Sequence, residues 1–225
     1  MKPTAPWTDA DTARLGACRA HVDLSAGRPI TPFVDVMASF RPRHGADEQL
    51  LAAGPFELYN FQALGDGTYQ RGGALAVGTG VLGAAALGAT LAASAVGNHS
   101  RKKRAQADAV PRWVQIDGGR IVVSNFGFYL ETGAGLLPWS LTDLDQIEMV
   151  GPGQLLMCGT SMQGTIRWIL ASDWAELLFV VWTHALAPRH PQLLGGGWLP
   201  PGWLDHVRSH GYGSALGPAP GLLEQ

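Results

Sequence analysis

The side chains that could do chemistry in this sequence are scattered and do not form a catalytic set. His206 and His210 stand four residues apart, so on a helix both imidazoles could reach one metal ion, but Asp205 is the only carboxylate beside them. Ser161 and Ser172 have no partner base near them, and no Gly-x-Ser-x-Gly motif is present. These patterns predict a protein with no metal ion, no catalytic residues and no enzyme activity.

The acidic side chains and the cysteines have structural interpretations. Asp143 comes before a predicted strand, as turn residues do, whereas Asp173 and Glu176 stand at a predicted helix start, where the helix dipole favours negative charge. Cys18 and Cys158 are far apart and belong to no Cys-x-x-Cys motif. The sequence therefore predicts neither a zinc site nor a disulfide framework.

One glycine pattern has a chemical alternative. Gly78, Gly80 and Gly83 fit Gly-x-Gly-x-x-Gly, in which glycines let backbone amides approach the pyrophosphate of a dinucleotide at a helix start. That reading makes the chain an NADP-binding oxidoreductase. The residues before Gly78 form a poor strand, however, and the later sequence is patterned as hairpins rather than βαβ units. We expect no cofactor, and this function stays as the least favoured alternative.

The same region has a second and stronger pattern. Residues 72–97 contain no charged side chain, and as a helix they would be about 39 Å long, against about 30 Å for a bilayer core. Small residues recur there every four positions and share one helix face, which lets a second helix pack closely. They are Ala76, Gly80, Ala84, Gly88 and Ala92.

A basic quartet follows the uncharged run, and it predicts which side of a membrane the chain faces. Arg101, Lys102, Lys103 and Arg104 are typical of a cytoplasmic flank and of contact with anionic lipid. We therefore predict a transmembrane or membrane-embedded helical insertion, with the folded parts on the cytoplasmic side of the cell membrane. The start of the sequence, with no apolar core behind Lys2, is not that of a secretory signal.

The insertion can be arranged in three ways. A single crossing would separate the strand predicted at 55–61 from those predicted after Trp113. A helical hairpin avoids this, but arms of about 12 residues are too short to span and would lie in one leaflet. In the third arrangement the helices are soluble, and the small-residue face joins protomers of a self-assembling structural protein.

The composition fits this interpretation. Charged residues make up only 15% of the 225 residues, below the usual share of about 25%, so much of the chain is expected to be out of water. The net charge of -2 argues against a general nucleic-acid binder, which needs a surplus of Lys and Arg, so we expect no nucleic-acid partner.

The elements that must position these residues are mostly short strands. Helix-compatible spacing over 9–20 follows Thr8 or Asp9 as the N-cap, and alternation over 55–61 predicts a first strand. After the insertion, strands are predicted at 113–117, 120–124, 127–131, 136–139, 147–150, 154–160 and 165–171, with Gly118-Gly119 as a hairpin turn. A helix follows over 174–186, capped by Ser172 or Asp173, and a short one over 204–209.

This order of elements resembles the bacterial pleckstrin-homology-like (PH-like, GRAM-like) domains. The residues that carry the resemblance are 113–124, 127–130, Pro138-Trp139, 144–150 and 173–178. The tail Leu199–Leu204, Leu-Pro-Pro-Gly-Trp-Leu, is similar to that of a group of actinobacterial membrane proteins. The resemblance implies an α+β, mostly antiparallel β-domain with a C-terminal capping helix, and binding of lipid or protein rather than chemistry.

The resemblance also divides the chain. Residues 1–47 form an N-terminal helical region, 48–71 the first strand, 72–110 the insertion, 111–188 the β-domain with its capping helix, and 189–225 a Gly/Pro/Trp-rich tail. Eukaryotic members often bind phosphoinositides through basic residues between the first two strands, and this chain offers Arg120 and the basic quartet. In the tail, Trp198 and Trp203 either dock on the domain or anchor a partner or the membrane interface.

Overall fold

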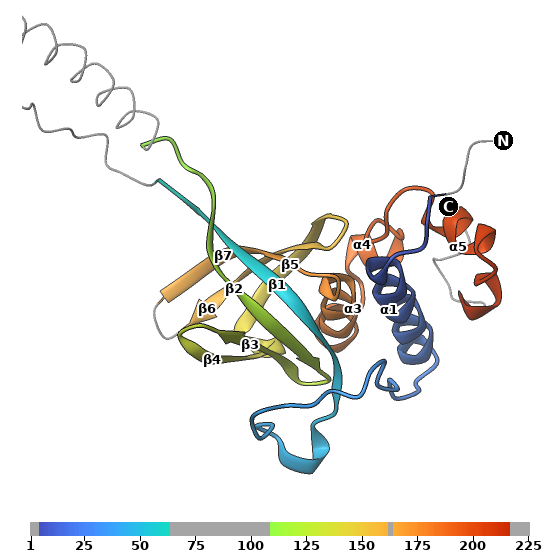
Figure 1. Cartoon of the computed structure of the whole chain (residues 1–225), viewed down its shortest axis with the longest axis horizontal. Coiled ribbons are helices and arrows are strands. Elements are labelled where there is room, and N and C mark those ends of the chain that lie inside the picture. The colour runs from blue at the N-terminus through green and yellow to red at the C-terminus, as the bar shows by residue number, and fades with distance from the viewer. Residues whose placement is uncertain (1–4, 64–108, 162–163, 217–225) are drawn as a thin grey trace, which may run out of the picture. The chain divides into compact units, whose positions relative to one another are not determined.

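The computed structural model of the chain describes residues 5–63, 109–161 and 164–216 (Figure 1). The chain divides into two compact units, Met1–Asn60 with Gln115–Gln225 and Phe61–Val114. The uncharged run, its small-residue face and the basic quartet lie outside the described residues. No helix in the described ranges is long and apolar enough to cross a membrane.

Seven antiparallel strands form one open sheet with the order β4-β3-β2-β1-β7-β6-β5. The predicted α+β, mostly antiparallel architecture is therefore confirmed. The strands are β1 (Leu50–Gln62), β2 (Arg112–Ser124), β3 (Gly127–Thr132), β4 (Gly135–Ser140), β5 (Leu144–Gly151), β6 (Gln154–Ser161) and β7 (Gly164–Ala171).

One predicted turn is wrong. Gly118 and Gly119 were expected to join two strands, but they lie inside the continuous strand β2. The reason for glycine here is close approach of neighbouring backbones, because a Cβ on Gly119 would come within 2.1 Å of the Glu131 carbonyl oxygen and one on Gly118 within 3.2 Å of the Phe56 oxygen. The glycine pair therefore lets β2 pass closely between β1 and β3.

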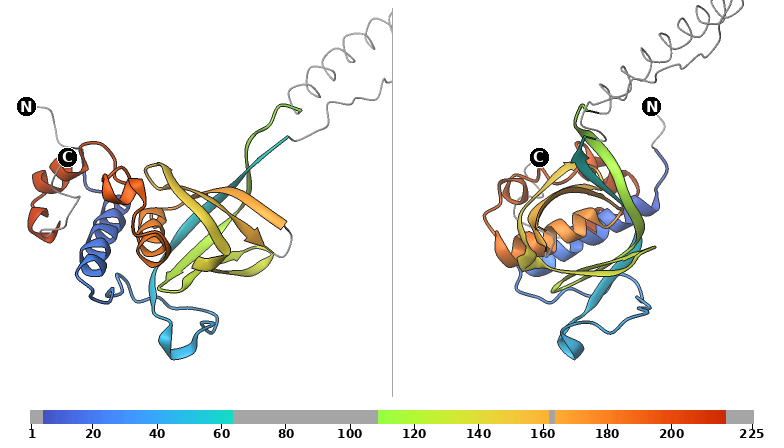
Figure 2. Two further views of the ribbon diagram at one scale, coloured as in Figure 1. Left: turned by 180° about the vertical axis from the view of Figure 1, so that it is seen from behind. Right: turned by 90° about the vertical axis from the view of Figure 1, so that its left-hand side faces the viewer.

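The concave face of the sheet holds the core, and a helix fills one end of it. Figure 2 shows the strands curving around α3 (Ala175–Leu186). Alternation along the strands puts apolar side chains on this face, and α3 adds a nearly continuous apolar surface. Fully buried members are Ile121, Phe128, Leu130, Leu155, Met157, Leu170, Leu178 and Phe179. The predicted helix after the last strand is thus present at the expected place.

The N-terminal helix α1 (Asp9–Ser25) packs against α3. Its start is fixed by a capping box, in which the Thr8 hydroxyl accepts from the Asp11 amide and Asp11 accepts from the Thr8 amide. Most of its residues from Ala13 to His21 are buried, because the C-terminal part of the chain covers the side that α3 leaves open. The predicted N-cap is confirmed, and the helix is longer than expected.

The segment after α1 contains no regular helix apart from the 3-10 turn Gly45–Asp47 and instead docks on the sheet. The Phe40 ring lies 4.3 Å from that of Tyr129, between ring centroids, on the outer side of β3. Below it Glu48, only 8% exposed, accepts hydrogen bonds from Ser124 Oγ at 2.7 Å and Tyr129 Oη at 2.8 Å. These contacts bury both faces of β3 and fix where β1 begins.

Both edges of the open sheet are blocked against further pairing. On β5, the side-chain amide of Gln192 in α4 (Pro191–Leu194) takes the place of a strand, since it accepts from Met149 N at 2.9 Å and donates to Met149 O at 2.8 Å. On β4, Pro138 has no N–H and the Ser140 amide donates to Asp143 at 2.8 Å. Such features prevent edge-to-edge aggregation.

Candidate functional site

Two large aromatic side chains close the interior of the sheet at the end away from α3. Trp139 of β4 pairs with buried Phe128, and Trp168 of β7 pairs with buried Met157, so both indoles lie on the concave face. Their ring centroids are 5.3 Å apart in an edge-to-face arrangement. The two strands are not neighbours in the sheet, so this contact spans its interior.

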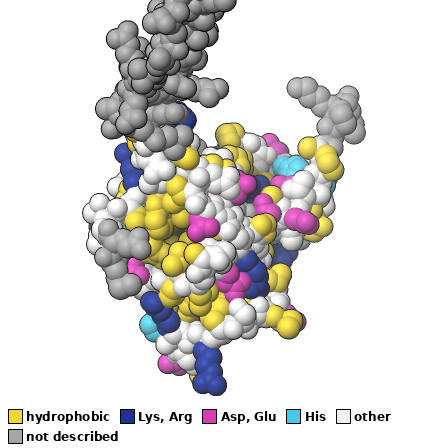
Figure 3. Space-filling model, turned by 60° about the vertical axis from the view of Figure 1, so that its left-hand side comes forward, with side chains coloured by type: hydrophobic (Ala, Val, Ile, Leu, Met, Phe, Trp, Pro, Cys, Tyr) yellow, Lys and Arg dark blue, Asp and Glu magenta, His cyan; other side chains and the backbone are white. Residues whose placement is uncertain are grey.

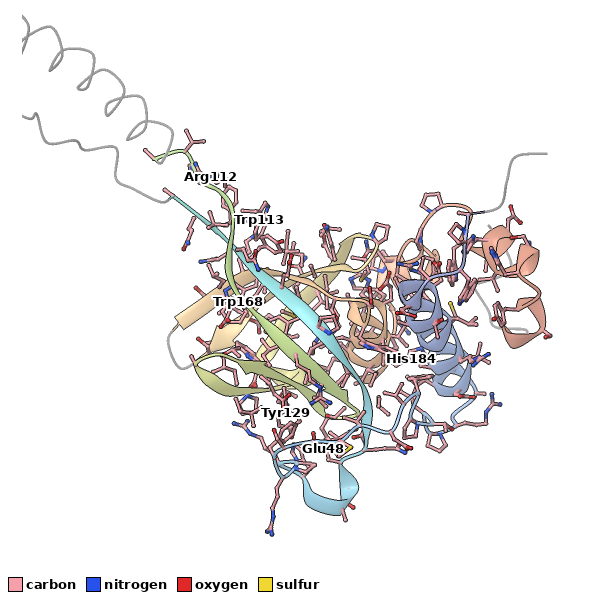
Figure 4. The ribbon with its side chains drawn as sticks, in the orientation of Figure 1. Glu48, Arg112, Trp113, Tyr129, Trp168 and His184 are labelled. Carbon is pink, nitrogen blue, oxygen red and sulfur yellow. The ribbon has the colours of Figure 1, made fainter. Side chains whose placement is uncertain are left out.

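Apolar side chains continue outward from this pair. Leu137 and Ile166 occupy the same face one step further from α3, and Leu137 is 43% exposed. Figure 3 shows hydrophobic side chains gathered on this side of the molecule, and Figure 4 locates Trp168. We call Leu137, Trp139, Ile166 and Trp168 the aromatic mouth. It is a solvent-accessible apolar surface on rigid strands, suited to contact with an apolar partner.

A second aromatic pair stands where β1 ends and β2 begins. Phe61 is 47% exposed and Trp113 is 36% exposed, and their ring centroids are 5.4 Å apart. Arg112 is the first residue of β2 (Figure 4). The contact between the rings means that the chain leaving β1 and the chain entering β2 are held together. We call Phe61 and Trp113 the strand-end pair, since they belong to the ends of two adjacent strands.

Arg120, the basic residue that this chain offers between the first two strands of the resembled domain, is engaged within the fold. Arg120 donates to Glu131 at 2.9 Å and to the Met37 carbonyl at 3.0 Å, so it holds the docked segment 37–48 against β3. The hydrogen bond from Arg120 lowers the pKa of Glu131, and burial opposes this only in part. The basic quartet and the small-residue face lie in the part of the chain that is not described.

Trp198 and Trp203 dock on the domain, rather than standing exposed as an anchor for a partner or the membrane interface. They are 2% and 4% exposed, so the exposed-anchor interpretation is wrong for these side chains. Trp198 packs against Phe179 and His21, and Trp203, the first residue of α5 (Trp203–Ser209), packs against Trp7 and under the Arg14 guanidinium at 5.0 Å. The tail is bound to α1 and α3 by these indoles because burying them removes a large apolar area from water.

The remaining candidates are structural. His206 stacks on Trp7 and lies 3.4 Å from Asp11, while His210 turns back to the His206 carbonyl, and no group of metal-binding side chains forms within the described ranges. The Ser172 hydroxyl donates to Pro55 O at 2.8 Å, in a shallow hollow of about 450 Å³. Burial raises the pKa of the Cys18 thiol to about 12, so it is not a reactive thiolate.

Sequence reasoning missed a buried ion pair. Glu176 was expected to complement the helix dipole behind a Ser172 or Asp173 cap, but the N-cap is Trp174, with no side-chain cap bond. Glu176 is fully buried, and its Oε1 accepts from Arg14 Nε at 2.9 Å and from Gly153 N at 3.0 Å. The partners are 162 residues apart, so no local pattern announces the pair.

Sequence reasoning also missed a contact between two histidines. His21 Nδ1 and His184 Nε2 are 2.9 Å apart between α1 and α3. Burial and the neighbouring His21 lower the pKa of His184 to about 4, so the ring is neutral at pH 7.

Comparison with known proteins adds no identity. No protein-family model, no curated protein and no solved structure matches the chain. The described surface offers two apolar features, the aromatic mouth, which is half-buried apart from exposed Leu137, and the exposed rings of the strand-end pair.

Proposed function

We propose that this chain is a non-enzymatic, membrane-associated binding or scaffolding module with a PH-like domain. In this proposal the residues between β1 and β2 attach it to the cytoplasmic face of the cell membrane, and the aromatic mouth is the surface that binds a partner. The expected partners are membrane lipid or a membrane-bound or cytosolic protein. The PH-like assignment is supported by the strand order, in which seven antiparallel strands are followed by a helix that fills one end of the curved sheet.

One observation carries the membrane part of the proposal. β1 and β2 are neighbours in the antiparallel sheet, and the Phe61 and Trp113 rings pack against each other at their ends. A segment inserted between such strands must leave and return at the same place. If it enters a membrane, we therefore expect it to enter and leave from one side, which supports the helical hairpin over the single crossing.

The length of the uncharged run fits a one-sided arrangement. Residues 72–97 folded into two arms give helices of about 12 residues, about 18 Å each, which reach into one leaflet of a core about 30 Å thick. The small residues at every fourth position favour close packing of one arm on the other. Exposed aromatic rings and Arg112 at the strand ends are side chains that the membrane interface favours.

The basic quartet is expected to set the preference for lipid charge. Each Lys or Arg near an anionic surface contributes about 1 kcal/mol, so the four contribute about 4 kcal/mol, or roughly several hundredfold in binding. Because exposed charges are screened, this part of the binding should weaken as salt is raised.

Flotation with lipid vesicles tests the proposal. The full chain should float with vesicles containing phosphatidylserine and more weakly with phosphatidylcholine alone. Changing the four residues Arg101–Arg104 to serine should lower flotation with the anionic vesicles to the level with neutral ones. The matched control changes four exposed arginines to serine, Arg19, Arg41, Arg43 and Arg189, and should float like the unchanged chain.

The alternatives give different results. A chain that stays with the soluble fraction and forms an oligomer that collapses on Gly80→Leu and Gly88→Leu would be a self-assembling structural protein. Saturable binding of NADPH, lost on Gly80→Leu, would point to the oxidoreductase, although each described strand pairing is antiparallel rather than the parallel pairing of dinucleotide-binding folds.

A further inference from the structure

A cavity of about 330 Å³ lies near the C-terminal ends of α1 and α3. Leu24 of α1 and Val181 of α3 line it, together with Pro29 and Ile30 from the loop after α1 and with Gln49 and Asn125 next to the sheet. His184 and Ala185 complete its lining. Its size falls in the range of small-molecule sites, which are mostly apolar with a few polar groups that fix orientation.

The polar groups around the cavity use only part of their hydrogen-bonding capacity. Asn125 is committed, because its Oδ1 accepts from Gln49 N at 2.8 Å and its Nδ2 donates to Asp47 O at 3.3 Å. His184 uses only Nε2, toward His21. In the described part of the chain, the second ring nitrogen of His184 and the side-chain amide of Gln49 have no hydrogen-bond partner.

The charges around the cavity restrict the ligand. No Asp, Glu, Lys or Arg is among the described residues that line it. Burial and His21 keep His184 neutral at pH 7, so neither a cation nor an anion finds a charged partner there. An uncharged ligand satisfies both conditions.

We propose that this cavity binds an uncharged, largely apolar small molecule that forms one hydrogen bond with His184. The apolar part of the ligand lies against Leu24, Ile30 and Val181, and its hydroxyl or amide group meets the free ring nitrogen. This site is distinct from the aromatic mouth and does not depend on membrane attachment.

The test uses p-cresol as the probe, with toluene and 4-methylbenzylammonium as matched compounds, titrated into the full chain. Binding is followed by NMR of the Val181 methyl groups and the His184 ring. We expect saturable shifts with p-cresol at both residues. His184→Leu should weaken p-cresol about two- to tenfold, the effect of one hydrogen bond, and leave toluene unchanged. The ammonium compound should bind at least tenfold more weakly than p-cresol.

A pair of variants separates occupancy of the cavity from loss of folding. Ala185 is exposed at the rim, so Ala185→Trp should fill the entrance and abolish the p-cresol shifts without unfolding the chain. Leu186 is next to it, 45% exposed and outside the lining, so Leu186→Trp should bind p-cresol normally. The proposal is overturned if p-cresol gives no saturable shifts at Val181 and His184, if Ala185→Trp binds it as well as the unchanged chain, or if the ammonium compound binds equally well.

Discussion

Replacing Arg14 by methionine should destabilise the protein strongly, because it isolates a buried carboxylate. Glu176 is fully buried, and its two hydrogen bonds come from Arg14 and from the Gly153 amide. Its second oxygen, Oε2, has no partner in the described structure. Arg14 is itself 7% exposed and also contacts Asp11 at 3.3 Å and the Trp203 ring. The pair therefore joins α1 to α3 and to the start of α5.

The magnitude follows from what remains after the change. Without the guanidinium, the fully buried Glu176 carboxylate keeps only the Gly153 amide as a donor, and removing one partner of a buried ion pair costs about 3–5 kcal/mol. Domains of this kind have free energies of unfolding of about 5–15 kcal/mol. At about 2–4 °C per kcal/mol for a chain of this size, the melting temperature should fall by about 6–20 °C.

Thermal melts and urea titrations of a double-mutant cycle measure this. The double variant Arg14→Met with Glu176→Leu should recover most of the loss, since it removes both charges and keeps the volume apolar. Arg19→Met is the matched control, because Arg19 is exposed on the same helix and should change stability little. If the free energy of unfolding of Arg14→Met lies within about 1 kcal/mol of that of the unchanged chain, the assignment of this pair as the link between α1 and α3 is refuted.

Three further predictions concern the fold and its titration. Replacing residues 64–108 by a short Gly/Ser loop should leave the melting temperature nearly unchanged, because β1 and β2 are neighbours whose ends already meet at Phe61 and Trp113. A replacement that prevents folding would contradict this prediction. Since the pKa of His184 is lowered from 6.5 to about 4, the unfolded chain binds this proton more readily, so urea titrations should show stability falling as the pH drops from 6.5 toward 4, with a shallower fall in His184→Phe. Tyr129→Phe should lower the free energy of unfolding by about 1.5–3 kcal/mol, because it removes a hydroxyl that donates to the buried carboxylate of Glu48. The control is Tyr212→Phe, at a side chain that is 41% exposed, and it should leave the free energy of unfolding almost unchanged.

The strands after the insertion could be predicted because each has one face in the core. β3 to β7 begin and end within three residues of the predicted ranges, since alternation and turn residues are local signals. The glycine pair in β2 was misread for the same reason. A hairpin turn and a close approach of backbones both require glycine, and only the neighbouring carbonyl of Glu131 distinguishes them.

The site could be predicted only in part. Local sequence patterns could not show that Trp139 and Trp168 face each other across the sheet with Leu137 still exposed. Trp198 and Trp203 stand in a Gly/Pro-rich stretch that gives no sign of their distant partners, which are His21 and Phe179 for Trp198 and Trp7 and Arg14 for Trp203. The Arg14–Glu176 and His21–His184 contacts depend on how two distant helices pack, which no periodicity encodes.

Labelling of both flanks of the insertion tests the central claim most directly. In a chain with Cys18 and Cys158 changed to alanine, a single cysteine is placed at Gln62 or at Val110 and is treated with a membrane-impermeant maleimide in intact cells and in inverted vesicles. The chain should be found with the membrane fraction, and both cysteines should react only in inverted vesicles, because β1 and β2 are adjacent strands and keep both flanks on one side, which the proposal takes as the cytoplasmic side. Reaction of the two positions from opposite sides, or recovery of the chain wholly outside the membrane fraction, would contradict the account.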